Sequence, residues 1–357
     1  MRRDNVVDTV ALLRSLSEAS GVSGYEGPVR DLVRQAFEPY ADEIRVDALG
    51  NLIALRRGTR PEGQPVRSIM LAAHTDEIGL MVTGIERGFL RVARVGGTDP
   101  RTTLGQEVVV HGRRPLHGII GSRPPHVLPP DARKNVVPFD ELFVDVGLPA
   151  ERLGEEVRIG DLITLYQPFT ELAEGYVAGK ALDDRAGVVT LAICLEMLAA
   201  SRHSWDVYAV ATTQEEVGLR GATVSAYSVA PDAAIAIDVG FGRQKGVSED
   251  DSVAMDGGPA LAVGPNVHPV LHEEIVRAAK AEEIKYQVEV APGATGTDGW
   301  AIQVAREGVP TEVISVPLRY MHSTVETLCV ADVERTGRLM ARFIAGLDES
   351  FSERLGL

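Results

Sequence analysis

Short apolar runs alternate with stretches of helical periodicity in the second half of this chain, from about residue 176 onward. The first helical stretch reads DRAGVVTLAICLEMLAA, the last reads ADVERTGRLMARFIAGL, and the apolar runs VYAVATT, AAIAID and TEVISVP lie between them. Strands and helices that alternate along a chain pack as a parallel sheet with helices on both faces. The alternation therefore predicts an α/β fold, a three-layer α/β/α sandwich with a mostly parallel central sheet.

The region before residue 176 divides into two parts with different sequence patterns. Residues 1–76 predict two helices, an extended pair around IRVDALGNLIAL and the buried strand SIMLAAH. Between residues 77 and 175 helical periodicity disappears, and short β-rich runs separated by glycine and proline predict a small antiparallel barrel. The runs are GLMVTG, FLRVARV, EVVVHG, HGIIG, LFVDVG and DLITLY. We expect one discontinuous α/β domain, residues 1–76 and 176–357, with a β-barrel domain of residues 77–175 inserted into it.

The charge balance narrows the partners that the chain can bind. Its 357 residues carry a formal net charge of -15. Such a chain repels phosphate backbones and anionic lipids, so we expect neither nucleic acid nor a membrane as a partner. No apolar run approaches the roughly 20 residues of a membrane span, and the first 20 residues predict an amphipathic helix. Cys194 and Cys329 lie in apolar periodic stretches, which predicts buried thiols and a cytoplasmic protein.

Polar residues follow buried strands or open helices at five places in this pattern. In α/β sheets, ligands bind at the carboxyl ends of the strands. Together the five places supply histidines and carboxylates, which zinc, cobalt and manganese accept as ligands. They are His74 with Asp76 in LAAHTDEIG, Asp183 with Asp184 in GKALDDRAG, Glu215 with Glu216 in TTQEEVG, Asp238 in AIAIDVG and His322 in VPLRYMHSTVE.

Each place also has an ordinary structural interpretation when it is taken alone. A histidine at a strand end can be a hydrogen-bonded structural residue, Asp184 and Arg185 can form an ion pair that caps a helix, and Asp238 can belong to a turn. Adjacent Glu215 and Glu216 can be a solvated strand end. Carboxylates beside apolar strands are costly to desolvate, so their recurrence favours a shared divalent cation.

Six segments of the sequence form an ordered series of motifs. They are AHTDEIG, GKALDDRAG, TTQEEVGLRGA, AIDVG, GTDGWAIQ and RYMHSTVE, and GSRPPHVL lies within the expected insert. In this order the series resembles that of the tetrahedral aminopeptidases, or glutamyl aminopeptidases, which form metallopeptidase family 42. The resemblance extends over essentially the whole chain. It implies a zinc aminopeptidase-like fold and a dinuclear metal-dependent aminopeptidase that removes N-terminal residues from peptides.

The resemblance implies two divalent metal ions per subunit, zinc or cobalt, with manganese as an alternative. His74 and Asp238 match the family's ligands to the first ion. Glu216 and His322 match the ligands to the second ion, and Asp183 matches the carboxylate that bridges both. Two ions held about 3.5 to 4 Å apart can activate a water and stabilise the oxyanion that forms from the scissile carbonyl.

The resemblance gives the two adjacent glutamates different roles. Glu215 matches the general base, and Asp76 matches a carboxylate that orients the ring of His74. Successive strand residues point to opposite faces, so adjacent glutamates need not share a role. Glu216 can bind metal while Glu215 takes a proton from water and passes it to the leaving amine.

The resemblance also implies a homo-oligomer, because similar proteins assemble through the inserted β-domain into dimers and then hollow dodecamers. A related dinuclear metal deacylase and a non-enzymatic assembly protein that retains the fold remain alternatives. A glycosidase needs only two carboxyl groups and leaves His74, Asp183, Asp238 and His322 without a role. Neither the preferred N-terminal residue nor the native metal follows from the sequence.

Several further polar residues have open roles. Asp298 precedes an expected helix, which predicts capping, with substrate positioning as the alternative because the resemblance places its loop beside the substrate pocket. Arg319 and Tyr320 adjoin His322 and carry the same alternative. Arg123 and His126 lie in the Pro-rich stretch of the insert, where they could line a site across a subunit interface. We expect structural roles for His111, His117, His203, His268 and His272.

Overall fold

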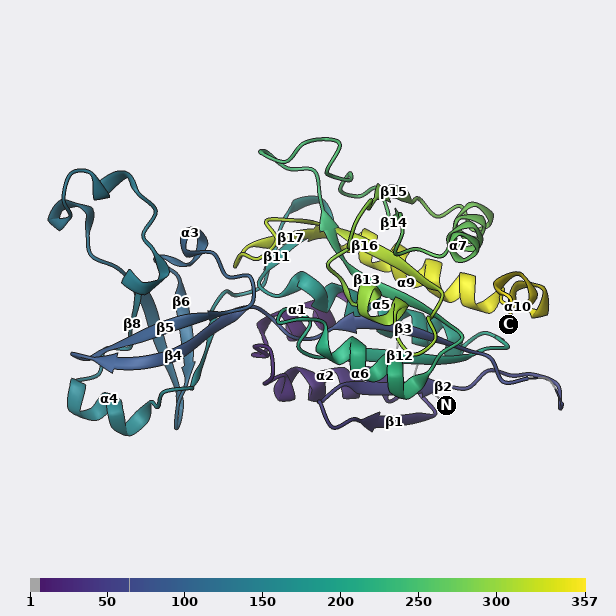
Figure 1. Ribbon diagram of the computed structural model, residues 1–357, viewed down its shortest axis with the longest axis horizontal. Coiled ribbons are helices and arrows are strands. Elements are labelled where there is room, and N and C mark those ends of the chain that lie inside the picture. Colours follow the sequence, from purple (N-terminus) through teal and green to yellow (C-terminus); the bar gives the residue numbers. More distant parts are fainter. Residues whose placement is uncertain (1–6, 64) are drawn as a thin grey trace.

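The computed structural model describes residues 7–63 and 65–357, which form two bodies along one elongated molecule (Figure 1). A large sheet covered by helices makes up one body, and a closed barrel projects from one end of it, at the left of the view. The amphipathic helix expected near the N-terminus is α1 (Thr9–Glu18), while residues 1–6 lie outside the described part of the chain. The predicted α/β sandwich with an added barrel is confirmed.

The main path of strands through the large sheet is parallel only in its centre. There β12 (Asp206–Thr212), β3 (Ser68–His74), β13 (Ala233–Phe241) and β16 (Thr311–Arg319) lie side by side and run parallel, whereas the strands of the path on both flanks run antiparallel to their neighbours. Short connections explain the antiparallel pairing of β17 (Glu326–Cys329) with β16 and of β2 (Leu52–Arg56) with β1 (Glu43–Val46), because a parallel crossover needs a dozen or more residues and each of these pairs is joined by fewer. The path is β1 (Glu43–Val46), β2 (Leu52–Arg56), β12 (Asp206–Thr212), β3 (Ser68–His74), β13 (Ala233–Phe241), β16 (Thr311–Arg319), β17 (Glu326–Cys329), β11 (Tyr176–Gly179) and β10 (Thr170–Glu171), and β14 (Ala260–Val263) and β15 (Gln287–Val290) join it beside β16.

Helices cover both faces of the large sheet. On one face α1, α2 (Gly27–Phe37), α5 (Leu182–Ala199), α7 (Pro269–Ala281) and α9 (Val330–Ala345) share a single apolar core with the strands. On the other face α6 (Arg220–Val229) and α8 (Asp298–Gln303) pack over β3, β12, β13 and β16. Helix α5 is buried nearly all round because it lies between the central strands and α9, which explains why its sequence is apolar on every face.

The barrel contains all six of the β-rich runs that the sequence indicates. Its strands close in the order β4 (Gly79–Glu86), β5 (Phe89–Val95), β8 (Phe143–Asp145), β7 (Pro115–Gly121), β6 (Glu107–His111) and β9 (Leu162–Leu165), around a core of their own. Alternate residues of β7 are buried and exposed, as expected for a strand with one face in a barrel core. Two helices that the periodicity does not predict, α3 (Pro100–Thr103) and α4 (Ala150–Glu156), lie in the connections.

Among the described residues, the α/β body contains four strands and one α-helix that the sequence pattern does not indicate. They are β10, β11, β14, β17 and the C-terminal helix α10 (Glu349–Leu355). None of these strands is longer than four residues, and β17 begins with a buried glutamate that breaks the apolar pattern. Among the described helices, none combines the length and the apolar character needed to cross a membrane.

Candidate metal centre

The sequence-predicted side chains gather at one edge of the large sheet. His74 is the last residue of β3, Glu215 and Glu216 follow β12, and Asp238 lies near the end of β13. The carboxyl ends of parallel neighbours meet at the same edge, so these residues converge although they are far apart in the sequence. Asp183 reaches them from the beginning of α5.

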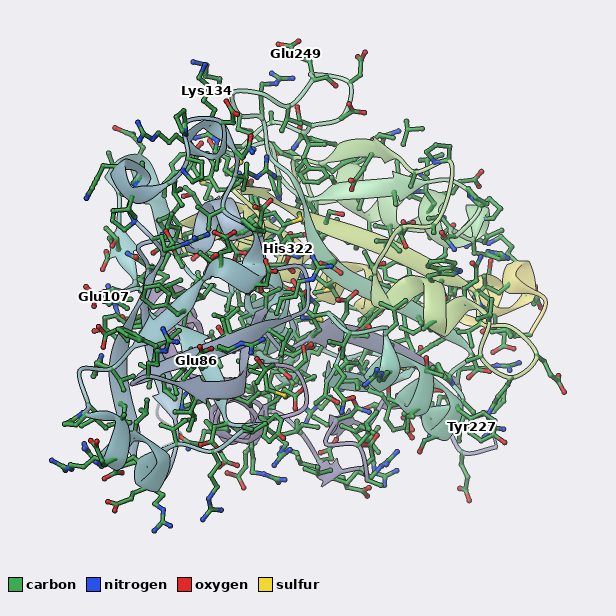
Figure 2. The ribbon with its side chains drawn as sticks, turned by 60° about the vertical axis from the view of Figure 1, so that its left-hand side comes forward. Glu86, Glu107, Lys134, Tyr227, Glu249 and His322 are labelled. Atoms are coloured by element: carbon green, nitrogen blue, oxygen red, sulfur yellow. The ribbon has the colours of Figure 1, made fainter. Side chains whose placement is uncertain are left out.

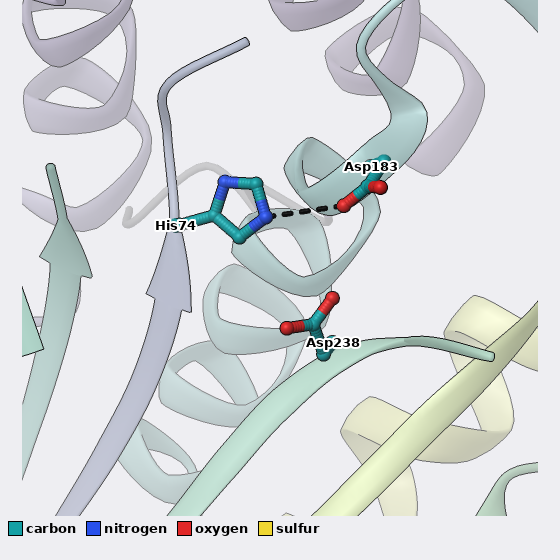
Figure 3. A group of neighbouring side chains, drawn as sticks. All are labelled: His74, Asp183 and Asp238. Atoms are coloured by element: carbon teal, nitrogen blue, oxygen red, sulfur yellow. Dashed lines mark hydrogen bonds and ion pairs between the residues drawn. The ribbon is translucent and has the colours of Figure 1, made fainter. Parts of the chain in front are cut away.

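A first group of three side chains consists of His74, Asp183 and Asp238, all almost fully buried. Figure 3 shows them pointing toward one another from β3, the start of α5 and β13. The Nε2 atom of His74 lies 3.1 Å from Oδ1 of Asp183. One ligand atom from each residue lies within 4.8 Å of the others, which is close enough for one cation to touch all three.

A second group consists of Asp183, Glu216 and His322. The Nε2 atom of His322 lies 3.3 Å from Oδ2 of Asp183 and 3.4 Å from Oε1 of Glu216, and the three ligand atoms again lie within 4.8 Å of one another. His322 lies where the barrel meets the large sheet (Figure 2). Asp183 therefore belongs to both groups and faces each histidine with a different oxygen, the geometry of a carboxylate that can bridge two cations.

The electrostatics of the cluster favour a bound cation. Burial raises the pKa of Asp238 and of Asp184 well above the usual range, and it raises the pKa of Glu215 to about 10. Hydrogen bonds with Asp183 and Glu216 raise the pKa of His322 to about 11. Buried carboxylates with too few cationic partners are costly as anions, and a divalent cation would stabilise them. The donor set thus fits a metal.

The carboxylate of Asp76 stabilises the cluster through hydrogen bonds. Its Oδ1 accepts the backbone N–H of Glu215 at 3.0 Å, and its Oδ2 accepts the N–H of Glu216 at 3.2 Å and the hydroxyl of Ser23 at 2.6 Å. For Nδ1 of His74, the backbone carbonyl of Asp76 is nearer, at 3.2 Å, than its carboxylate, at 3.5 Å. Asp76 thus anchors the loop that carries both glutamates and faces the ring of His74.

Sequence reasoning missed three residues that shape the site. Ser23 lies in GVSGYEG, which the sequence indicates only as a turn, yet it bonds to Asp76. Buried Glu326 accepts the N–H of Asp183 at 3.1 Å and that of His322 at 2.9 Å, so it links the backbones of these two residues. Gly97 comes from the barrel and touches the ring of His322. A glutamate within a buried strand was the only signal that could have indicated Glu326.

The predicted capping role of Asp298 is wrong. Thr297 caps α8 by accepting the N–H of Gly299, and Asp298 is a buried residue of the first turn. Its Oδ2 accepts the hydroxyl of Thr212 at 2.5 Å, while its Oδ1 has no hydrogen-bond partner among the described residues. Burial raises the pKa of Asp298 to about 6.

Asp184 does not form the ion pair with Arg185 that one interpretation of the sequence suggested. Its carboxylate accepts the N–H groups of Gly187 and His74, while the guanidinium of Arg185 contacts Glu77 and backbone carbonyls. The carboxylate of Asp184 therefore helps to fix the end of β3 beside the start of α5.

The remaining candidates lie outside the cluster. Arg319 donates to the carbonyl of Arg243 and lies over the ring of Tyr176, and Tyr320 is about half exposed. Arg123 forms an exposed ion pair with Glu141 on the barrel. His126 lies in the exposed short helix Pro125–Val127 of the same region, and its predicted role at an interface stays a prediction.

Four of the five remaining histidines have side-chain contacts of a structural kind. Nε2 of His111 lies 3.0 Å from the hydroxyl of Ser20 and 2.7 Å from that of Thr164, which joins the barrel to the loop after α1. His203 bonds to the carbonyl of Trp205, and the ring of His117 packs against Tyr166. His272 pairs with Glu312, whereas the buried Nδ1 of His268, the residue before α7, has no hydrogen-bond partner among the described residues, so its structural role stays a prediction.

The fold and this donor set define a class, the metal-dependent hydrolases with an α/β sheet. Beside the two groups lies a cavity of about 690 Å³, large enough for a substrate residue. Comparison with known proteins identifies the family: the chain belongs to the M42 glutamyl aminopeptidases, whose family profile matches residues 50–339.

Individual relatives agree with this assignment. The lysyl aminopeptidase of Pyrococcus furiosus is 40% identical over 342 residues, covering 92% of this chain and 94% of the relative. The TET aminopeptidase of a marine sediment Thaumarchaeota archaeon superimposes with a TM-score of 0.91 at 36% identity, covering 97% and 99% of the two chains. The Pyrococcus horikoshii TET1 peptidase, which can assemble into a tetrahedron or a large octahedral shell, superimposes with a TM-score of 0.83 at 33% identity, covering 95% and 100%. This chain is an aminopeptidase, a hydrolase that acts on peptides.

Proposed function

We propose that this chain removes N-terminal residues from peptides with two divalent ions per subunit and with Glu215 as the general base. His74, Asp183 and Asp238 would hold the first ion, and Asp183, Glu216 and His322 would hold the second. The observation that carries the proposal is that Asp183 faces both histidines through opposite oxygens, at 3.1 and 3.3 Å. A bound pair of ions would activate water and stabilise negative charge on the scissile carbonyl oxygen.

The residues of the chain supply proton transfer and orientation. Glu215 lines the cavity beside both groups, with Oε2 4.0 Å from Nε2 of His74. From there it can accept a proton from a water in the cavity and donate it to the leaving amine, which general bases of this kind do with a rate gain of about 10²- to 10⁴-fold. The buried carboxylate of Asp76 accepts the backbone N–H of Glu215, and this hydrogen bond positions the proposed base.

Metal removal tests the proposal directly. Treatment with a chelator should abolish hydrolysis of aminoacyl chromogenic substrates, and zinc, cobalt or manganese, added one at a time, should restore it and identify the preferred ion. Mass spectrometry should find two ions per chain in the active protein. Glu215→Gln should retain both ions and lose about 10²- to 10⁴-fold in kcat.

Two outcomes would favour the alternatives. Faster cleavage of substrates with an acylated α-amine than of free-amine substrates would indicate a metal deacylase. A fully metal-loaded protein that hydrolyses neither kind of substrate would indicate an assembly protein that retains the fold. The family name and the relative's name mention glutamyl and lysyl residues, so they leave the preferred residue of this chain open.

We further infer that residues 77–175 act as an assembly domain for a homo-oligomer, with dimers that build a dodecamer. The shells formed by the Pyrococcus horikoshii relative support this. The barrel also exposes large apolar side chains, among them Phe89, Leu104, Ile119, Val127 and Val136. Two buried free thiols, Cys194 and Cys329, support a reducing location such as the cytoplasm.

Sedimentation velocity tests the assembly. Ile119→Asp and Val127→Asp place a charge on the exposed barrel surface and should shift the protein to smaller species, because burying an unpaired charge in an interface is costly. Val66→Asp, the same kind of change at an exposed valine of the other body, serves as the control. Unchanged sedimentation of both barrel variants would argue against the barrel as the assembly surface.

A further inference from the structure

The cavity beside the candidate metal centre has a second wall whose residues have no part in the proposed chemistry. It is lined there by Val239, Gly240 and Phe241 of β13, by Glu289 of β15 and by Trp300 of α8. Side chains two apart on a strand point to the same face, so Gly240 faces the cavity on the same side as Asp238. The second wall therefore lies next to the metal ligands, where the first residue of a bound peptide would sit.

The carboxylate of Glu289 occupies the space that Gly240 leaves free. A Cβ atom placed on Gly240 would lie 3.3 Å from Oε2 of Glu289. The same oxygen accepts the hydroxyl of Ser315 at 2.7 Å, and Ser315 is the register partner of Asp238 on the neighbouring strand. Gly240 is two strand residues, about 7 Å, beyond Asp238 on β13, so the carboxylate beside Gly240 lies next to this candidate ligand on the cavity wall.

The surroundings of Glu289 are acidic and apolar. Among the described residues, no lysine, arginine or histidine forms an ion pair with Glu289, and neither lysine nor arginine lines the cavity. Phe241 and Trp300 are each about half exposed and flank the same space. A chain of methylene groups that ends in a cation complements such a pocket, because its stem can pack on the rings while its charge reaches the carboxylate.

We propose that Glu289 selects peptides whose N-terminal residue is basic, lysine or arginine. The proposal rests on the proposed aminopeptidase function and assigns the residue that contacts the first side chain of the peptide. A second hollow of about 540 Å³ continues beyond Glu289 and carries Asp250 and Asp251 without a basic residue in its lining. It extends the negative field and leaves room for the longer guanidinium of arginine, whereas an acidic N-terminal residue is repelled.

The test compares substrates that differ only in the terminal charge. For the metal-loaded protein, kcat/KM is measured with lysyl, arginyl, norleucyl and glutamyl chromogenic substrates, because norleucine has the four-carbon stem of lysine without its ammonium group. The wild-type protein should prefer the lysyl over the norleucyl substrate. Glu289→Gln should lower that ratio about ten- to hundredfold, mainly through KM, since a hydrogen bond to a charged group is lost.

Two further variants make the test specific. Glu289→Arg should reverse the selectivity and raise the ratio of glutamyl to lysyl cleavage above that of the wild type. Glu307→Gln removes one negative charge from an exposed position outside the cavity and should leave the ratios unchanged. Metal content is measured for every variant, and it should stay at the wild-type value.

The outcomes separate this inference from the proposed function. A wild-type protein that cleaves norleucyl as well as lysyl substrates would overturn the role of Glu289 and leave the aminopeptidase intact. An unchanged ratio in Glu289→Gln would overturn it equally. Absence of hydrolysis with every free-amine substrate, at full metal loading, would instead refute the proposed function itself.

Discussion

Asp76 is a buried residue whose carboxylate serves three hydrogen-bond donors and faces the ring of His74. The donors are the N–H groups of Glu215 and Glu216 and the hydroxyl of Ser23. Both oxygens are used, so the carboxylate fixes the backbone of the proposed base, Glu215, and of one candidate ligand, Glu216, together. A neutral amide has only one acceptor oxygen and cannot satisfy all of these donors.

Asp76→Asn should therefore weaken metal binding about 10- to 100-fold, the usual loss when a residue that orients metal ligands is changed. Zinc titration by calorimetry measures this without reference to activity. Ser23→Ala removes one donor and keeps the carboxylate, so its loss should be smaller. Wild-type affinity in Asp76→Asn would show that the ligands hold their positions without it.

The residues of the site were predictable to different degrees. His74, Asp183, Glu216, Asp238 and His322 stand at strand ends or a helix start, where apolar patterning marks the edge of the sheet, and the structure brings all five together. Ser23, Glu326 and Gly97 act through contacts across more than 50 positions of sequence, which no local pattern encodes.

The loop after β12, which carries Glu215 and Glu216, is fixed at both ends by the side chain of Asn51. Oδ1 of Asn51 accepts the N–H of Thr213, and Nδ2 of Asn51 donates to the carbonyl of Gly221, so one side chain closes both ends of the loop. A Cβ atom at Gly221 would lie 2.4 Å from Asn51 Oδ1 and from the carbonyl of Thr213, which explains the glycine. The loop between them holds Glu215 and Glu216 at the edge of the sheet.

At this scale the apolar runs of the central strands predicted their position well, because burial on both faces leaves a continuous signal. Two features could not be predicted in the same way. Strand β17 contains Glu326. The cost of burying its carboxylate is offset by the hydrogen bonds that it accepts from the backbone N–H groups of Asp183 and His322. Direction in the flanks of the sheet depends on connection length rather than on composition.

The packing of α7 on β16 contains a buried acid, Glu312, whose Oε2 lies 3.2 Å from Nδ1 of His272. Burial raises the pKa of Glu312 from 4.5 to about 6, and the hydrogen bond with Glu312 raises the pKa of His272. Between pH 4.5 and 6 the folded state keeps a proton on Glu312 that the unfolded state releases, so stability falls as pH rises through this window. The contribution of His272 is lost at higher pH, as its raised pKa is passed.

Glu312→Gln removes the loss of stability that comes from the titration of Glu312. Relative to the wild type, its free energy of unfolding should increase by about 2 kcal/mol between pH 4 and pH 6.5, from a shift of about 1.5 pKa units. Urea denaturation at the two pH values measures the difference. Groups that do not contact Glu312 titrate alike in both proteins and cancel, whereas His272, whose raised pKa depends on Glu312, adds to the difference only as the pH approaches 6.5. If the two proteins differ in free energy of unfolding by the same amount at both pH values, the raised pKa does not belong to Glu312.

The two bodies of the molecule meet at the metal centre. Gly97, in the barrel loop after β5, lies so close to His322 that an added Cβ atom would come within 2.4 Å of its Nδ1 and 2.6 Å of its Cε1. The neighbouring Gly96 approaches Glu216 in the same way, at 3.3 Å. The barrel thus forms the outer wall of the second group of ligands.

Gly97→Ala should displace the ring of His322 and lower the affinity of the second metal site about tenfold or more, with the first site less affected. Counting bound ions per chain after dialysis against limiting zinc distinguishes one occupied site from two. Gly154→Ala, in α4, is the matched control because an added Cβ atom there meets open space. Equal ion content in Gly97→Ala and the control would contradict this contact.

The barrel joins the α/β body beside the candidate ligands at its first strand. β3 ends at His74 and the barrel strand β4 begins at Gly79, whereas β10 and β11 of the large sheet separate the last barrel strand, β9, from Asp183 in α5. In the proposed oligomer, a force on the barrel from a neighbouring subunit would therefore reach His74 through the short link between β3 and β4, and His322 through Gly97. Contacts that hold the barrel in place in the proposed oligomer should therefore strengthen metal binding, and loss of the ions should in turn weaken the assembly.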